Sequence, residues 1–125
     1  NVYGGREIVS GKYATLIALF INKYKKGESL TVVSPGTQQR NFTYIDDIVN
    51  GLVLVGENAY GDNYGIGCSQ SYSILEIAEA FGSEITMLPE RRGNRMVADV
   101  ITEKTMKLGW SPKKTLNNYI QECLN

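Results

Sequence analysis

Residues 12–27 read KYATLIALFINKYKKG, and this stretch carries the strongest structural signal in the sequence. Its apolar side chains recur at the three- and four-residue spacing of one helix face; they are Tyr13, Leu16, Ile17, Phe20, Ile21 and Tyr24. Lysines gather in the last turn, where the helix dipole favours positive charge, and Gly27 suits the left-handed conformation that ends many helices. We therefore predict a helix over residues 12–26.

Short apolar segments alternate with helical ones along the rest of the chain. Strands are predicted at residues 30–33, 42–45, 63–66 and 85–88. Further helices are predicted at residues 46–56, 73–82, 102–109 and 115–124. The helix that ends at residue 109 is expected to begin at either Asp99 or Thr102. Asp46 or Asp47 is expected to cap the first of these helices and Ser73 the second, with Glu76 completing a capping box. Ile48, Leu52 and Val55 are expected to face inward. This order predicts one small domain of mixed α/β topology over residues 1–125.

The composition excludes several broad classes of protein. The 125 residues include 13 Lys+Arg and 13 Asp+Glu, so the formal net charge is zero. A protein without a basic excess is not expected to bind nucleic acid or anionic lipid through non-specific electrostatic attraction. The 42% of apolar residues is typical of a globular protein, and no apolar run approaches the about 20 residues that span a bilayer. We expect a cytoplasmic protein without nucleic-acid or membrane partners.

The residues that most often carry chemistry at neutral pH are scarce. There is no histidine, and the two cysteines, Cys68 and Cys123, are far apart in the sequence, so a zinc site or a histidine-dependent triad is not expected. This argues against a self-contained enzyme. The chain also begins at Asn1, directly before the apolar pair Val2-Tyr3, and we expect it to be a piece of a longer protein.

Arginines supply the candidate anion sites. Arg40 follows a turn at residues 35–39 and precedes an extended segment, where its planar fork could bind a phosphate; local sequence alone favours a surface arginine, solvated or paired with Asp46 or Asp47. Residues 89–95, PERRGNR, contain three arginines and a glycine, and are compatible with either an anion clamp or a solvated charge cluster.

Two other motifs favour structural roles. Asp46 and Asp47 are adjacent, so they do not share a helix face, and capping is a better interpretation than a metal or acid-base pair. Residues 63–70, NYGIGCSQ, superficially match a dinucleotide fingerprint, but Gln70 replaces its third glycine and the preceding segment is polar. A tight turn is the favoured interpretation there.

Taken in order, several stretches resemble the C-terminal part of the extended short-chain dehydrogenase/reductase family, the NAD-dependent nucleotide-sugar epimerases and dehydratases, and most of all its UDP-glucose 4-epimerase-like branch. The stretches are NVYG (1–4), the helix at 12–27, GTQQRNFTYIDD (36–47), YGIG (64–67), PERRG (89–93), AD (98–99) and LGWSP (108–112). The resemblance covers essentially the whole chain.

The resemblance implies a small mixed α/β substrate-binding domain from a two-part Rossmann-type enzyme. In that family an N-terminal Rossmann domain holds NAD and a Tyr-x-x-x-Lys pair moves protons, whereas the C-terminal part binds the nucleotide diphosphate-sugar. This chain has no G-x-x-G-x-x-G, and none of its 8 tyrosines is followed four residues later by lysine. The resemblance thus implies a UDP-sugar ligand, no cofactor in this chain, NAD in a full-length parent and a missing N-terminal Rossmann domain.

Position by position, the resemblance assigns a small set of ligand contacts and no catalytic residue. Asn1 matches a residue that contacts the sugar nucleotide, Arg40 and Arg91 match arginines that reach the diphosphate or nucleoside, and the segment around Lys12, Tyr13 and Ala14 matches one whose amides approach the phosphates. Arg92 and Arg95 match no family position. Gly65 stands where the family usually has asparagine, and Asn41 where it has aspartate. The alternative is a stand-alone nucleotide-diphosphate-binding or interaction domain.

Overall fold

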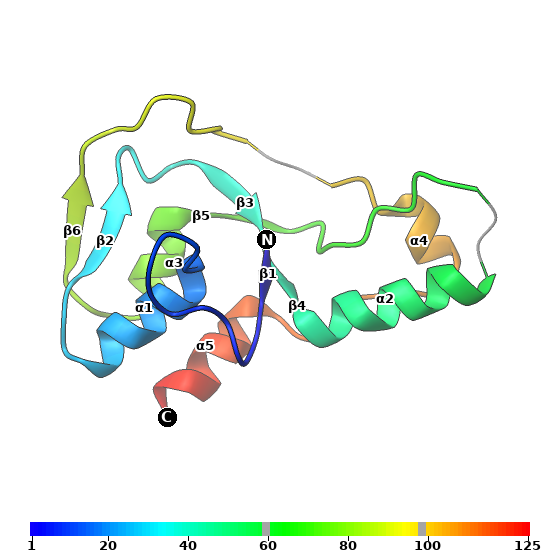
Figure 1. Ribbon diagram of the computed structural model, residues 1–125, viewed down its shortest axis with the longest axis horizontal. Coiled ribbons are helices and arrows are strands. Elements are labelled where there is room, and N and C mark those ends of the chain that lie inside the picture. The colour runs from blue at the N-terminus through cyan, green and yellow to red at the C-terminus, as the bar shows by residue number, and fades with distance from the viewer. Residues whose placement is uncertain (59–60, 98–99) are drawn as a thin grey trace.

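The computed structural model describes residues 1–58, 61–97 and 100–125, and it confirms the mixed α/β class (Figure 1). The strands are β1 (Val2–Tyr3), β2 (Leu30–Val33), β3 (Gln39–Asn41), β4 (Thr43–Tyr44), β5 (Ser71–Ser73) and β6 (Ile85–Leu88). The helices are α1 (Leu16–Lys25), α2 (Ile45–Asn58), α3 (Ile74–Ala80), α4 (Glu103–Lys107) and α5 (Leu116–Leu124).

The strands pair as three two-stranded sheets. β1 and β4 run parallel, with Val2 opposite Thr43, and β2 and β6 run parallel, with Leu30 opposite Ile85. β3 and β5 run antiparallel, with Arg40 opposite Tyr72. Segments far apart in the sequence are therefore brought side by side at each pairing.

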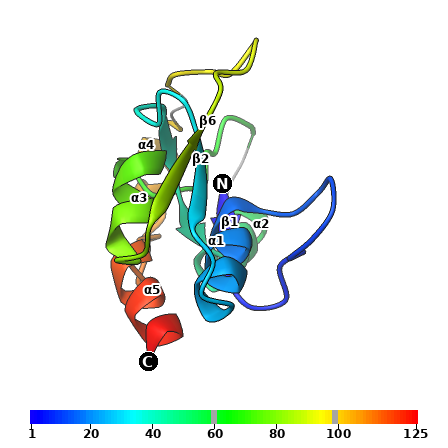
Figure 2. The same cartoon turned by 90° about the vertical axis from the view of Figure 1, so that its left-hand side faces the viewer.

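The core lies where α1 and α3 pack on opposite faces of the β2–β6 sheet (Figure 2). Leu30 and Val32 of β2 are fully buried, and Phe20 of α1 meets Phe81 edge to face with ring centroids 5.7 Å apart. α3 begins as expected, because the Ser73 hydroxyl accepts a hydrogen bond from the backbone N–H of Glu76.

Helix α1 begins at Leu16, four residues later than the predicted range of 12–26. Residues 11–14 form a turn instead, in which the backbone N–H of Ala14 donates to the carbonyl of Gly11. The Thr15 hydroxyl donates to the Glu7 carboxylate. Tyr13 consequently lies outside the helix and is 74% exposed, although it fits the apolar period.

Neither Asp46 nor Asp47 caps α2, because the helix already begins at Ile45. Asp47 is buried, and its Oδ2 accepts hydrogen bonds from the backbone N–H groups of Lys113 and Lys114 at 3.0 and 3.1 Å. Its carbonyl accepts the indole N–H of Trp110 at 2.8 Å. The expectation of a capping role was wrong because this carboxylate satisfies backbone donors distant in sequence.

The inward face of α2 also differs from the prediction. Gly51 and Asp47 are buried, Ile48 and Val55 are half-buried, and Leu52 is 59% exposed. A second apolar stripe therefore lies on the surface; we call it the α2 outer face, and it consists of Ile45, Val49, Leu52 and Val53. Figure 1 shows α2 extending away from the β2–β6 sheet, beside α4.

Residues 63–66 form no strand, and the predicted strand there was wrong. The Gly65 carbonyl accepts the Thr105 hydroxyl of α4, so this segment is held by a side chain and not by a strand ladder. The helix start at Asp99 and the family motif at residues 98–99 lie outside the described residues. Among the residues that are described, none belongs to a helix long and apolar enough to cross a bilayer.

Two glycines of α2 give a matched test of its packing. A Cβ on Gly51 would lie 2.7 Å from Ile66 and 3.0 Å from the Trp110 indole, whereas a Cβ on Gly56 would meet nothing within 4 Å. We expect Gly51→Ala to destabilise the fold by about 1–2 kcal/mol through overpacking, and Gly56→Ala to stabilise it by up to about 1 kcal/mol through helix propensity. Urea unfolding measures both; changes of the same sign would contradict this packing of α2.

Candidate functional site

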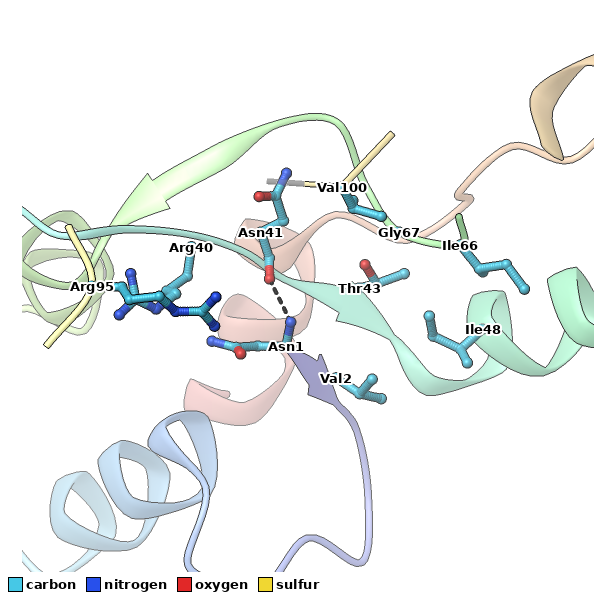
Figure 3. Close-up of a pocket in the computed structure, with 10 residues that line it drawn as sticks. All are labelled: Asn1, Val2, Arg40, Asn41, Thr43, Ile48, Ile66, Gly67, Arg95 and Val100. Carbon is cyan, nitrogen blue, oxygen red and sulfur yellow. Dashed lines mark hydrogen bonds between the residues drawn. The ribbon is translucent and has the colours of Figure 1, made fainter. Parts of the chain in front are cut away.

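One pocket gathers residues from several separated parts of the chain. It has a volume of about 270 Å³ and is open to solvent (Figure 3). Its lining residues are Asn1, Val2, Arg40, Asn41, Thr43, Ile48, Ile66, Gly67, Arg95 and Val100. No carboxylate lines it among the residues that the structure describes. The pocket thus combines two arginines, polar side chains and an apolar wall.

Strand β3 positions Arg40 on this pocket. Its half-buried side chain donates from Nη1 to the Gln39 carbonyl at 2.7 Å and from Nη2 to the Asn94 amide oxygen at 3.4 Å. Neither Asp46 nor Asp47 forms a salt bridge with it in the described part of the chain. A guanidinium has five N–H donors, so Arg40 keeps donors for a ligand.

Backbone pairing holds Asn1 beside Arg40. The amino group of Asn1 donates to the Asn41 carbonyl at 2.8 Å, and the Asn1 carbonyl accepts from the backbone N–H of Thr43 at 2.8 Å. Burial, and then the positive charge of Arg40, lowers the pKa of this amino group. Strand pairing therefore places Asn1 on the same pocket as Arg40.

Asn41 closes the inner side of the pocket. Its Nδ2 donates to the Cys68 carbonyl at 2.6 Å, and the Cys68 N–H donates to the Thr43 hydroxyl at 2.9 Å. An ionised aspartate at this position would have no N–H to offer that carbonyl. Burial raises the pKa of the Cys68 thiol, which makes it a poor nucleophile.

The three arginines of residues 89–95 divide between two cavities. Arg91 and Arg92 line a second cavity of about 330 Å³, together with Gln38 and Asn94, whereas Arg95 lines the Arg40 pocket. The structure therefore brings Asn1 and Arg40 together but places Arg91 in the neighbouring cavity. Arg95 was given no role from the sequence, and its only signal there was membership of the arginine cluster.

Lys12, Tyr13 and Ala14 line neither of these cavities. They belong to the loop before α1, which projects to one side of the molecule in Figure 2. Thr15, directly after them, lines a third cavity of about 210 Å³ that also includes Asn1. Their predicted contact with phosphates stays a prediction.

The glycines of residues 63–70 do not form a cradle for a dinucleotide. A Cβ on Gly65 would overlap the Ile101 carbonyl oxygen, and one on Gly67 would lie 2.8 Å from Val100. These glycines therefore admit the chain's own residues, with which a side chain at either position would collide. The contact with Ile101 also leaves no room at Gly65 for the asparagine that is usual in the family. No group of three or more potential metal ligands occurs in residues 1–58, 61–97 or 100–125.

Comparisons with known proteins match this chain to one family. Residues 1–67 match the NAD dependent epimerase/dehydratase family. The chain is 32% identical to UDP-glucuronic acid decarboxylase 1 of Danio rerio, covering 97% of this chain and 31% of that protein. It is 30% identical to a putative UDP-glucose 4-epimerase of Methanocaldococcus jannaschii, covering 100% of this chain and 42% of that protein.

Solved structures agree with this match. The fold superimposes on a UDP-glucose 4-epimerase of Thermotoga maritima, solved with UDP-glucose, with a TM-score of 0.88 and 26% identity, covering 99% of this chain and 42% of that one. The chain thus spans less than half the length of these relatives. Its fold, its sequence and the match over residues 1–67 show that it belongs to the NAD dependent epimerase/dehydratase family.

Proposed function

We propose that this chain is the C-terminal, substrate-binding part of a nucleotide-sugar epimerase or dehydratase, and that it positions the diphosphate of a UDP-sugar. The observation that carries the proposal is the half-buried Arg40 on a pocket that no described carboxylate lines. Uncompensated arginine at a cavity is suited to an anionic ligand. The relatives are named for reactions of UDP-sugars, which supports that choice.

The size of the pocket supports a ligand site that this chain shares with another domain. Its volume of about 270 Å³ is just below the range of typical ligand pockets, which span about 300–1,000 Å³. It suits a diphosphate with part of its attached groups better than a whole nucleotide sugar. The remaining contacts, NAD and the proton-transfer pair would come from an N-terminal Rossmann domain outside this chain.

The α2 outer face supports the existence of such a domain. Ile45, Val49, Leu52 and Val53 are each at least 37% exposed and follow helical spacing, so they form one continuous apolar stripe. An apolar stripe of this kind is typical of a surface that another folded unit covers. Val2 of β1, which is 45% exposed, adds a further apolar side chain outside the helix. We propose the nucleotide-binding domain as the occupant of this face, in a protein of the cytoplasm.

The isolated chain should bind UDP weakly and NADH not at all. We expect a dissociation constant of millimolar order for UDP, about −4 kcal/mol, because half of the cleft is absent, and we expect no epimerase or dehydratase turnover. Chemical-shift mapping with UDP should perturb residues around Arg40. Perturbation confined to residues 68–73, or saturable micromolar binding in an NADH fluorescence titration, would contradict the proposal.

The α2 outer face can be tested with an apolar dye. We expect Leu52→Glu to reduce dye binding while changing stability by less than about 0.5 kcal/mol, since the side chain is exposed. Met87→Glu, at an exposed position on β6, is the matched control. This variant should bind as much dye at the α2 outer face as the wild-type chain does. Fusing the chain to the N-terminal part of the Thermotoga maritima enzyme should remove that signal. Undiminished dye binding in the fusion would contradict docking on this face.

A further inference from the structure

A fourth cavity is separate from the Arg40 pocket, and we call it the loop cavity. It forms between the β1–α1 loop, α1 and α5, and Figure 2 shows this loop running out from β1 and back to α1. Its volume of about 300 Å³ is at the lower limit of the range for ligand pockets. It shares no lining residue with the Arg40 pocket, and none of the described residues next to the undescribed positions lines it. A ligand in the loop cavity would therefore leave the proposed diphosphate site free.

Apolar side chains from three parts of the chain line the loop cavity. Ala18 and Ile21 of α1 are three residues apart and so share a helix face, and Val9 comes from the loop. Tyr119 of α5 is the third contribution, and its ring is held against the ring of Tyr3 with the centroids 5.0 Å apart. Val9 is exposed, and Ile21 and Tyr119 are half-buried. These side chains therefore keep apolar surface that a ligand can cover.

Two cations accompany these apolar side chains. Arg6 of the loop and Lys25 of α1 both line the cavity, and neither forms a salt bridge within residues 1–58, 61–97 and 100–125. Glu7 lines the cavity too, and its Oε1 accepts a hydrogen bond from the Thr15 hydroxyl at 2.8 Å. Two cations and one carboxylate leave a single net positive charge, which matches a monoanion better than a phosphate dianion.

The backbone at Arg6 gives a second indication of a ligand site. Its φ is 68°, in the left-handed region that residues other than glycine seldom adopt. Strain of this kind persists only where the surroundings impose it, and it is found most often at functional sites. The loop is closed by the backbone N–H of Thr15, which donates to the Ile8 carbonyl at 3.2 Å. A guanidinium is thus kept on this cavity at a position where glycine would fit without strain.

We propose that the loop cavity binds a small amphipathic carboxylate. The apolar part of the ligand would cover Ile21, Val9 and the Tyr119 ring, and its carboxylate would accept charge-assisted hydrogen bonds from Arg6 and Lys25. This site is distinct from the one in the proposed function, and neither depends on the other.

The test is a titration of the chain with octanoate at neutral pH, followed through the Ala18 methyl, Ile21 methyl and Tyr119 ring resonances. We expect a dissociation constant of millimolar order, because the cavity is small and open to solvent. Octanol, which lacks the charge, should bind more weakly, and octylammonium should not bind. Saturation with UDP should leave the octanoate affinity unchanged within about twofold, since the two sites share no residue.

Neighbouring cations on α1 supply a matched pair of variants. Lys25→Ala should weaken octanoate binding up to about fivefold, the range of a solvent-exposed ion pair. Lys26→Ala, which removes a charge that does not line the cavity, should weaken it less than about twofold. Arg6→Gly should weaken binding as Lys25→Ala does without lowering the melting temperature, because glycine relieves the backbone strain. Leu52→Glu controls for binding at the α2 outer face and should have no effect on the octanoate affinity.

Several results would overturn this site. They are an absence of octanoate binding at millimolar concentration, octanol binding as tightly as octanoate, or Lys26→Ala acting as strongly as Lys25→Ala. Competition between octanoate and UDP would place the carboxylate in the Arg40 pocket and would also overturn the loop cavity as its site. Weak UDP binding, or none, would bear on the proposed function alone.

Discussion

The buried carboxylate of Asp47 is the constraint on which the arrangement of this chain depends. It accepts two backbone N–H groups from residues 113–114, and the carbonyl of the same residue accepts the Trp110 indole. A charge removed from water must find such partners or destabilise the fold. Asp47 therefore ties the start of α2 to the segment that leads into α5. Because α2 follows β4 directly, the same bonds fix the direction of the strand that precedes it.

The pocket depends on this tie because its residues come from elements that Asp47 anchors indirectly. β3 and β4 are nearly continuous, so Arg40, Asn41 and Thr43 are carried on the segment that ends at α2. β1 pairs with β4 and brings Asn1, while the loop after β6 brings Arg95. No contiguous motif makes the site. The site forms where the β1–β4 and β3–β5 pairs lie next to each other, and the side chain of Arg40 faces the cavity there.

Local rules predicted much of the fold. Gly27 and Gly82 adopt the left-handed conformation after α1 and α3, Ser73 and Thr115 accept first-turn N–H groups of their helices, and residues 30–33 and 85–88 form strands at the predicted bounds. These features depend on neighbours in sequence. The start of α1, the inward face of α2 and the absence of a strand at residues 63–66 depend on partners distant in sequence, which periodicity does not report. The role of Asp47 was missed for the same reason.

The residues of the candidate site also divide into those that the sequence predicted and those that depend on partners distant in sequence. Arg40 and Asn1 were selected by resemblance and do share a pocket, whereas Arg95 enters only through the backbone bond between residues 39 and 96. A crystal structure of the chain with UDP is the most direct test of the proposed diphosphate site. We expect the diphosphate to lie against the guanidinium group of Arg40, in the pocket that Asn1 and Asn41 also line. A diphosphate that binds elsewhere, with no contact to Arg40, would contradict this assignment.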